Sequence, residues 1–438
     1  MGIRHVVIVG GGFGGLAAAK ALKNAAVHVS LIDRSNHHLF QPLLYQVATS
    51  VLTPGQIGSP IRNILRKQRN TTVVLGEVTG VDAANKCVFV DGTDRSGVPI
   101  PYDFLILATG VTYSYFGHDE FAAHAPGLKT LADAVAIRNG ILQAFEQAEA
   151  EEDPGRHRDL LTFVLVGAGP TGVEMASAIA VLVRNTLKSE FRRIDPASAR
   201  IVLFDAAPRV LGTFSEKLSA AATRRLESLG VEVRLGHAVD QIDAEGVIVA
   251  GERIYSKTVI WTAGVAPSAA GKWLKAPTDR AGRVRIQDDL SVTGHPDIFV
   301  VGDTASLDQD GRPLPGVAQV AIQQGRYAGK LIHRTVAGQP APPPFRYFDK
   351  GNMAVVGKGF AVLQSGKFQM SGFIAWLAWA AIHLQFLAQS SLRVSVFLQW
   401  VWTYVTGQRG SRLIVKHLGC TPTKPKSEDS AVVTVLNK

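Results

Sequence analysis

The chain has 438 residues, two cysteines and a formal net charge of +10 at pH 7. Its length predicts two or three domains with a large core. Cys87 and Cys420 are far apart and form no motif, which argues against a disulfide framework, a CxxC redox pair and a zinc site, and we expect no bound metal. No signal peptide is expected, because the first apolar strand begins within a few residues of the N-terminus.

The first predicted unit is a strand, a glycine-rich loop and a helix. The apolar run 6–9 leads into residues 10–15, which read Gly-Gly-Gly-Phe-Gly-Gly. In such a unit Gly10 makes the tight turn, Gly12 lets a pyrophosphate approach the backbone, and Gly15 lets the helix pack on the strand. N–H groups at the start of the helix then bind the phosphates. The alternative is a glycine turn without a ligand.

Two further features support a dinucleotide site in this first unit. Asp33 ends the strand 28–32, about 20 residues after the loop, where a carboxylate accepts a hydrogen bond from a ribose 2′-hydroxyl. The apolar run 104–107 predicts a buried parallel strand, and it ends in the small-residue turn that contains Thr109 and Gly110. The alternative for Asp33 is an ordinary turn residue.

A second unit of the same kind follows a polar helix predicted near 131–152. Its strand, 163–166, leads into a second loop with Gly167, Gly169 and Gly172, and we expect its helix to run from Gly172 to about Arg193. The next strand, 200–205, ends in Asp205, which lies farther from its loop than usual and therefore predicts a long crossover helix. An acid here repels a 2′-phosphate and favours NADH over NADPH, although the nearby Arg209 leaves NADPH open.

Later segments supply the remaining candidate site residues. The strand 258–261 ends in a turn with Ala263 and Gly264, and the run 297–303 ends in Gly302 and Asp303. Two loops and two small-residue turns in one chain indicate two dinucleotides, the arrangement needed to pass a hydride from one to the other.

Three polar residues lie on the predicted helices of these units. Glu174 is expected in the first turn of a helix, where the helix dipole favours a carboxylate. Gln319 and Gln323 are four residues apart on one helix face, and both are uncharged hydrogen-bond donors and acceptors. The alternatives are a favourable N-terminal helix residue for Glu174 and a solvated polar face for the two glutamines.

The composition changes after the Pro-rich linker 340–344. Residues 368–392 and 394–408 contain no charged side chain, four of the six tryptophans lie there, and basic residues follow. Tryptophan and basic residues favour a membrane–water interface. A pair of amphipathic helices lying in that interface is our main expectation, with a spanning helix or a buried soluble hairpin as alternatives. Lys367, before this segment, is a candidate for a quinone entrance or a lipid phosphate, or is a plain surface lysine.

Taken together, these motifs resemble those of the glutathione-reductase-like flavoproteins. The first loop with Asp33, the turn 108–110 and the run 297–303 carry this resemblance. A narrower resemblance, to the type II NADH dehydrogenases, rests on three segments and extends to about Val415. These segments are His37–Tyr45, Gly167–Glu174 and Ala318–Gln323.

The resemblance implies a non-pumping NADH:quinone oxidoreductase of a respiratory chain. It implies that FAD occupies the first loop, with Gly302 and Asp303 at its ribityl chain, and that NADH occupies the second. Glu174 would lie near the nicotinamide and the flavin, and Gln319 at the quinone side with Gln323 one turn on. Such enzymes lie on the cytoplasmic face of the inner or plasma membrane, so the expected partners are quinone and membrane lipid, with no nucleic acid and a homodimer left open.

We therefore predict an α/β fold with two Rossmann-like dinucleotide-binding domains and a C-terminal amphipathic-helix module. The expected division is an FAD domain in two parts, 1–113 and 280–345, an NADH domain at 114–279, a membrane-attachment module at 346–418 and a disordered tail at 419–438. A soluble NADH oxidase or ferredoxin reductase, and a flavin-bearing redox sensor, are the alternatives. Thiol–disulfide and sulfide-oxidising chemistry are disfavoured because the chain has only two cysteines.

Overall fold

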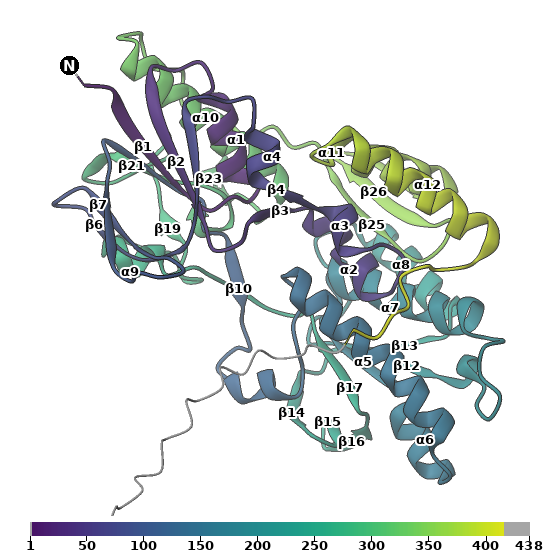
Figure 1. Cartoon of the computed structure of the whole chain (residues 1–438). Helices are drawn as coiled ribbons and strands as arrows, with labels where there is room; N and C mark the ends of the chain where they lie inside the picture. The colour runs from purple at the N-terminus through teal and green to yellow at the C-terminus, as the bar shows by residue number, and fades with distance from the viewer. Residues whose placement is uncertain (1, 416–438) are drawn as a thin grey trace, which may run out of the picture.

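A computed structural model describes residues 2–415, so the expected tail at 419–438 and Cys420 lie outside the described residues. Two parallel sheets dominate it, and a smaller antiparallel sheet carries the last two helices (Figure 1). The expected α/β fold class is confirmed.

The first sheet has six strands in the order β20-β21-β9-β1-β2-β5. Its central strands, β1 (Arg4–Val9), β2 (Val27–Asp33) and β9 (Phe104–Leu107), pair in parallel and are buried, as their apolar runs predict. β5 (Thr71–Leu75) forms one edge, while β20 (Ser291–Val292) and β21 (His295–Val300) complete the other. The strands of this sheet therefore come from two segments of the chain, one before and one after the segment that forms the second sheet.

Two helices pack against each other beside this sheet. Helix α1 (Phe13–Ala21) packs along α10 (Ala318–Val336). A Cβ at Gly325 would lie 2.0 Å from the carbonyl oxygen of Gly14, and one at Gly329 would lie 2.7 Å from that of Ala18. The two helices approach this closely only because both positions are glycine, and this approach brings the start of α10 to the first loop.

The second sheet has four parallel strands in the order β13-β12-β11-β17. They are β11 (Thr162–Val166), β12 (Arg200–Asp205), β13 (Val231–Leu235) and β17 (Thr258–Trp261). Helices α5 (Leu131–Ala150), α7 (Pro170–Val181) and α8 (Glu216–Ser228) surround it. The strands β10 (Val111–Tyr113) and β18 (Val265–Pro267) pair with each other and connect the two large sheets.

The prediction of one long helix from Gly172 to about Arg193 is wrong. Helix α7 ends at Val181, and a π-helical turn, Leu182–Thr186, follows it. The carboxylate of Glu149 on α5 then accepts hydrogen bonds from the backbone N–H groups of residues 192–194, at 2.9 to 3.2 Å. These N–H groups bind a side chain instead of helical carbonyls, so the connection folds back as a loop.

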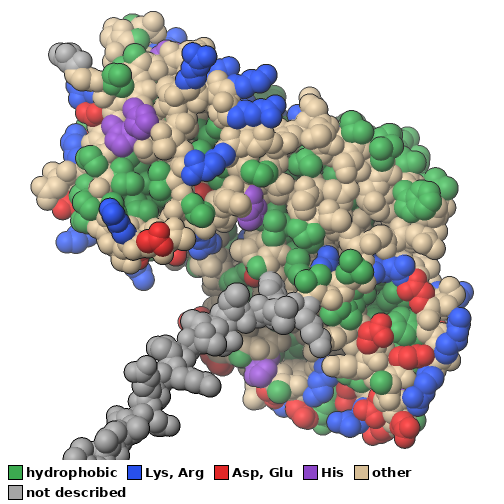
Figure 2. Space-filling view, in the orientation of Figure 1, with side chains coloured by type: hydrophobic (Ala, Val, Ile, Leu, Met, Phe, Trp, Pro, Cys, Tyr) green, Lys and Arg blue, Asp and Glu red, His purple; other side chains and the backbone are tan. Residues whose placement is uncertain are grey.

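The C-terminal part begins with the antiparallel strands β25 (Asn352–Val355), β26 (Ala361–Ser365) and β27 (Phe368–Gly372). Helix α11 (Phe373–Phe386) packs on this sheet, and helix α12 (Ser390–Thr406) packs against α11. Figure 2 shows hydrophobic side chains gathered on the face over these two helices. Among residues 2–415, no helix has both the length and the apolar character needed to cross a bilayer.

Candidate functional site

In the first glycine loop, neighbouring atoms of the chain leave no room for a side chain at two of the three motif glycines, whereas the third has open space around it. A Cβ at Gly10 would lie 2.3 Å from the carbonyl oxygen of Ala108, and a Cβ at Gly15 would lie 1.8 Å from that of Gly10. At Gly12 no atom lies within 4 Å of the Cβ position. The fold therefore requires glycine at Gly10 and Gly15, whereas only a closely approaching ligand would require it at Gly12.

The second loop repeats this pattern. A Cβ at Gly167 would lie 2.5 Å from the Cα of Ala263, and one at Gly172 would lie 1.8 Å from the carbonyl oxygen of Gly167. Gly169 again faces open space. Gly264, next to Ala263, is closed by the carbonyl oxygen of Ser114, 2.5 Å from its Cβ position.

The two acids bind their loops in the same way. Oδ2 of Asp33 accepts a hydrogen bond from the N–H of Gly11 at 2.6 Å, and Oδ2 of Asp205 accepts one from the N–H of Ala168 at 2.5 Å. In each case the other oxygen accepts from the N–H two residues further along, at 2.6 and 2.8 Å. An ionised carboxylate has about four acceptor positions, so each acid retains capacity for ribose hydroxyls.

The turn with Thr109 and Gly110 is bonded to the residue after Asp303. The hydroxyl of Thr304 donates to the carbonyl oxygen of Gly110 at 2.6 Å, and Thr109 Oγ1 lies 2.5 Å from Ser268 Oγ. The carboxyl end of β9 and the end of β21 are thereby held together, as expected for one ligand that lies across both.

The Asp303 carboxylate has no hydrogen-bond partner among the described residues. It makes no hydrogen bond to any residue between 2 and 415, while the preceding N–H, of Gly302, donates to Oε1 of Gln324 at 2.7 Å. Burial raises the pKa of Asp303, and the positive charges of Lys129 and Arg283 oppose that rise. A flavin ribityl chain, which offers hydroxyl donors, fits this side chain.

Gln319 and Gln323 both lie on α10, but their side chains differ in their hydrogen bonds. Nε2 of Gln323 donates to the carbonyl oxygen of Phe348 at 2.9 Å, and its Oε1 accepts from the N–H of Phe348 at 3.0 Å. Gln323 therefore fastens the chain beyond the Pro-rich linker to α10. The side chain of Gln319 forms no hydrogen bond within the described residues and stays available to a substrate.

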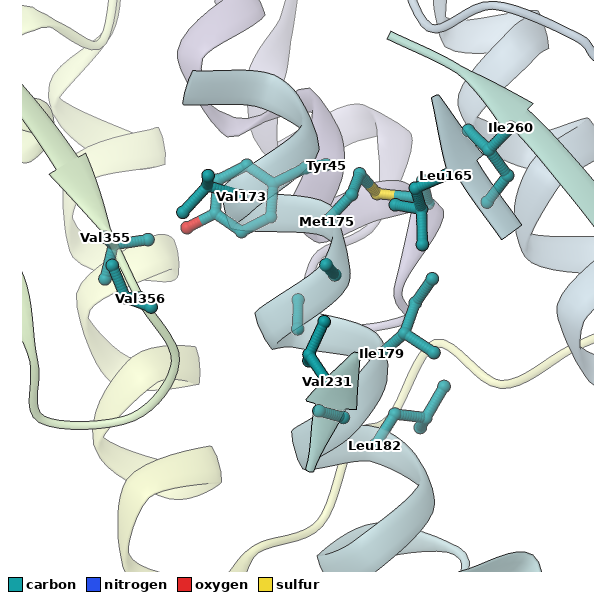
Figure 3. Packing of buried hydrophobic residues seen from close by; sticks show 14 of the residues in the cluster. Tyr45, Leu165, Val173, Met175, Ile179, Leu182, Val231, Ile260, Val355 and Val356 are labelled. Atoms are coloured by element: carbon teal, nitrogen blue, oxygen red, sulfur yellow. The ribbon is translucent and has the colours of Figure 1, made fainter. Parts of the chain in front are cut away.

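A mostly apolar cavity of about 120 Å³ lies between α2 (Leu44–Ala48), α7, α11 and α12. Figure 3 shows Tyr45 of α2 beside Val173 of α7, with the Tyr45 hydroxyl directed toward the side on which Val355 of β25 lies. Glu174 reaches this cavity from α7, whose first residues belong to the second glycine loop. Gln319 and Gln323 do not line the cavity.

Glu174 is not stabilised as an anion, contrary to the expectation from the helix dipole. It lies beyond the first turn of α7 and is partly buried, and desolvation raises its pKa to about 8. The N–H of Val355 donates to its Oε1 at 3.4 Å, which lowers the pKa only in part. Desolvation outweighs the dipole here, so Glu174 carries a proton at pH 7.

Three residues that sequence analysis gave no site role connect distant segments at this cavity. Nε1 of Trp400 donates to Oε1 of Gln46 at 2.7 Å, and Nε2 of Gln46 donates to the hydroxyl of Tyr45 at 3.0 Å. Arg409 is buried and donates to the carbonyl oxygens of Thr49 at 2.6 Å and of α7 at 3.1 Å. The sequence signals were the position of Tyr45 in the motif 37–45 and the presence of Trp400 and Arg409 in the segment expected at a membrane interface, where the structure instead has Arg409 buried.

Lys358 is the lysine that lines the cavity, and Lys367 is not. Lys358 Nζ donates to the carbonyl oxygen of Tyr404 at 2.7 Å and lies 4.4 Å from the centre of its ring. Lys367 is exposed in the turn between β26 and β27 and does not line the cavity.

Comparison with known proteins gives the same picture over most of the chain. Residues 4–325 match the model of the pyridine nucleotide-disulphide oxidoreductases. The chain is 48% identical to the type II NADH:quinone oxidoreductase Ndh of Mycobacterium tuberculosis, over 94% of this chain and 90% of that protein. NdhA of the same organism is 46% identical over 95% and 91%. The structure of NDH2 from Plasmodium falciparum in complex with NADH superposes with a TM-score of 0.85 at 19% identity, covering 94% of this chain and all of that one.

Proposed function

Because the chain belongs to the pyridine nucleotide-disulphide oxidoreductases and, among them, to the type II NADH:quinone oxidoreductases, we propose that it is a membrane-attached FAD enzyme that reduces a lipid quinone without pumping protons. One observation carries the finer part of this proposal. Helix α7 begins at the second glycine loop and also presents Glu174 to a cavity beneath α11 and α12. A single helix thus connects the proposed NADH seat with the apolar helices.

The first loop is the proposed FAD seat. Gly12 leaves room for the pyrophosphate, Asp33 accepts from the adenosine ribose, and Asp303 accepts from the ribityl chain. When bound, the flavin supplies the hydride and electron transfer, while the protein positions it and excludes water. Thr109 and Gly110 hold the edge of this seat through Thr304.

The second loop is the proposed NADH seat. Gly169 leaves room for the pyrophosphate, and Asp205 accepts from the ribose of the adenosine half. The guanidinium of Arg209 donates to the carbonyl oxygen of Gly212 at 3.1 Å, so it is engaged with its own loop. Since Asp205 would repel a 2′-phosphate, this arrangement supports NADH over NADPH. The turn with Ala263 and Gly264 borders the nicotinamide end.

Quinone is proposed to enter beneath α11 and α12. Apolar and aromatic walls suit a lipid quinone, and protonated Glu174 is the group there that can deliver a proton to a reduced oxygen. Gln319 is proposed to bind a quinone carbonyl, and the paired Gln323 to hold the neighbouring chain in place. The domain limits at residues 113, 279, 345 and 418, the cytoplasmic face and a homodimer stay predictions.

Anaerobic half-reactions test this function. NADH should bleach the yellow protein, and a soluble quinone should restore the colour. In Gln319→Leu we expect bleaching at the wild-type rate but reoxidation about fivefold slower, because one hydrogen bond to the quinone is worth about 1 kcal/mol. Stopped-flow absorbance separates the two steps. Gln323→Leu is the matched control and should reoxidise faster than Gln319→Leu; equal loss of both steps in Gln319→Leu would exclude its quinone role.

Membrane attachment is tested on the exposed apolar residues of α12. Val405 is 76% exposed, so Val405→Glu should fold normally yet bind phosphatidylcholine vesicles about tenfold more weakly, because a carboxylate is costly in the interface. Ile3, which is 77% exposed on β1's side of the molecule, provides the control Ile3→Glu. Vesicle co-sedimentation measures both. Equal binding of the two variants would show that α12 is not the attachment surface.

A further inference from the structure

A polar groove lies at the end of α7 that is remote from the second glycine loop. Its volume is about 560 Å³, within the range of small-molecule sites. Helix α6 (Pro154–Leu160), the π-helical turn, the start of β12 and Gly230 form its walls. Helix α6 lies at the lower right in Figure 1, far from the six-stranded sheet. We call this the arginine groove, after Arg158, Arg184 and Arg200.

The arginine groove has two positive charges without a carboxylate. Arg200 is paired with Glu232 through two hydrogen bonds, of 2.6 and 2.7 Å. Neither Arg158 nor Arg184 forms an ion pair with any residue between 2 and 415. The groove therefore has a surplus of positive charge that would attract an anion.

Arg184 is held in the groove with an unsatisfied donor. Its Nη2 donates to the carbonyl oxygen of Gly230 at 3.1 Å, while its Nη1 is shielded from solvent and has no acceptor in the described structure. Gly230 has a φ of +75°, and a Cβ there would lie 2.4 Å from Arg184 Nη2. These contacts hold the positive charge of Arg184 at the wall of the groove, where an anion would be attracted to it.

The groove is separate from the proposed NADH seat. Asp205 ends β12, whereas Arg200 begins it, so the groove lies at the amino edge of the four-stranded sheet. Dinucleotides lie at the carboxyl edge of such sheets. Helix α7 has 12 residues, which separates the two places by about 18 Å at 1.5 Å per residue.

We propose that the arginine groove binds a phosphate-bearing small molecule about the size of a nucleotide. A guanidinium group binds phosphate oxygens through paired hydrogen bonds, for which Arg158 is available, and Arg184 adds a second positive charge at the wall. Pro154, Leu161 and Ala199 supply an apolar wall for the rest of the ligand. The phosphate comes from a soluble phosphate ester or from a phospholipid headgroup.

The experiment uses the full chain with its flavin, saturated with NAD⁺ so that the second loop is filled. Titration calorimetry with pyrophosphate and with uridine diphosphate should show one site, and Arg158→Gln should weaken it at least tenfold while leaving NADH:quinone turnover unchanged. The exposed side chain of Arg158 forms no hydrogen bond or ion pair in the described structure, so we expect its replacement to leave folding intact. Arg156→Gln is the matched control: Arg156 lies on the same helix, pairs with Glu151 and does not line the groove.

A second arm distinguishes the two sources of phosphate. If the soluble probes do not bind but Arg158→Gln, and not Arg156→Gln, reduces binding to phosphatidylglycerol vesicles, the ligand is a lipid headgroup. The proposal is overturned if none of the three probes binds, or if both variants lose binding to the same extent. These outcomes are independent of whether NADH reduces the flavin, so they do not depend on the proposed function.

Discussion

Replacing Gly169 by valine is expected to leave the protein folded and yellow but to lower kcat/KM for NADH about a hundredfold, equivalent to ~2.7 kcal/mol of lost stabilisation. Gly169 has φ −69° and ψ −176°, an extended conformation that valine adopts without strain. No atom lies within 4 Å of its Cβ position. The new side chain would therefore begin in open space, where the pyrophosphate of NADH is proposed to lie.

Two matched variants separate ligand exclusion from damage to the fold. Gly172→Val places a Cβ 1.8 Å from the carbonyl oxygen of Gly167, so it should lower the Tm as well as NADH turnover. Gly12→Val applies the logic of Gly169→Val to the first loop and should yield folded, colourless protein. Visible absorbance, Tm and steady-state kinetics measure the three effects. An unchanged kcat/KM for NADH in Gly169→Val would mean that no dinucleotide crosses the second loop.

The loops and the strands beside them were predictable because their signals are local. An apolar run, three glycines and an acid about 20 residues on define a strand–loop–helix unit within one short segment. The strands 200–205 and 258–261 appear in the structure with those limits. The end of α7 was not predictable, because Glu149 on α5 takes the N–H groups of residues 192–194 from a distant part of the sequence.

The cavity could not be predicted from the sequence either, because residues far apart in the chain form it. Trp400 and Gln46 are 354 residues apart, so no spacing rule predicts their hydrogen bond. Arg409 follows an apolar, Trp-rich segment and resembles an interfacial cation, yet it is buried against α2 and α7. Gln319 and Gln323 share a helix face, but only the fold shows that the side-chain amide of Gln323 is hydrogen-bonded to the backbone of Phe348. Patterns identify residue types, whereas tertiary contacts determine which of them stay free.

Glu174→Gln is expected to change the pH dependence of stability by several kcal/mol. The pKa of Glu174 rises from 4.5 to about 8 on burial. Between these values the unfolded chain has lost a proton that the folded chain keeps, so the free energy of unfolding falls as pH rises from about 4.5 to 8. At ~1.4 kcal/mol per unit, the loss is on the order of 5 kcal/mol. Glutamine does not ionise, so the variant should lack this loss.

Guanidinium unfolding at pH 5 and pH 9 measures the difference. We expect the free energy of unfolding of Glu174→Gln to rise relative to that of the wild type only at pH 9. Glu174→Leu separates ionisation from hydrogen bonding: it should also remove the pH dependence, while losing the bond from Val355 at both pH values. A parallel pH dependence in wild type and Glu174→Gln would mean that Glu174 is ionised in the folded protein. It would then have no proton to deliver at pH 7, and the role proposed for it in quinone reduction would be untenable.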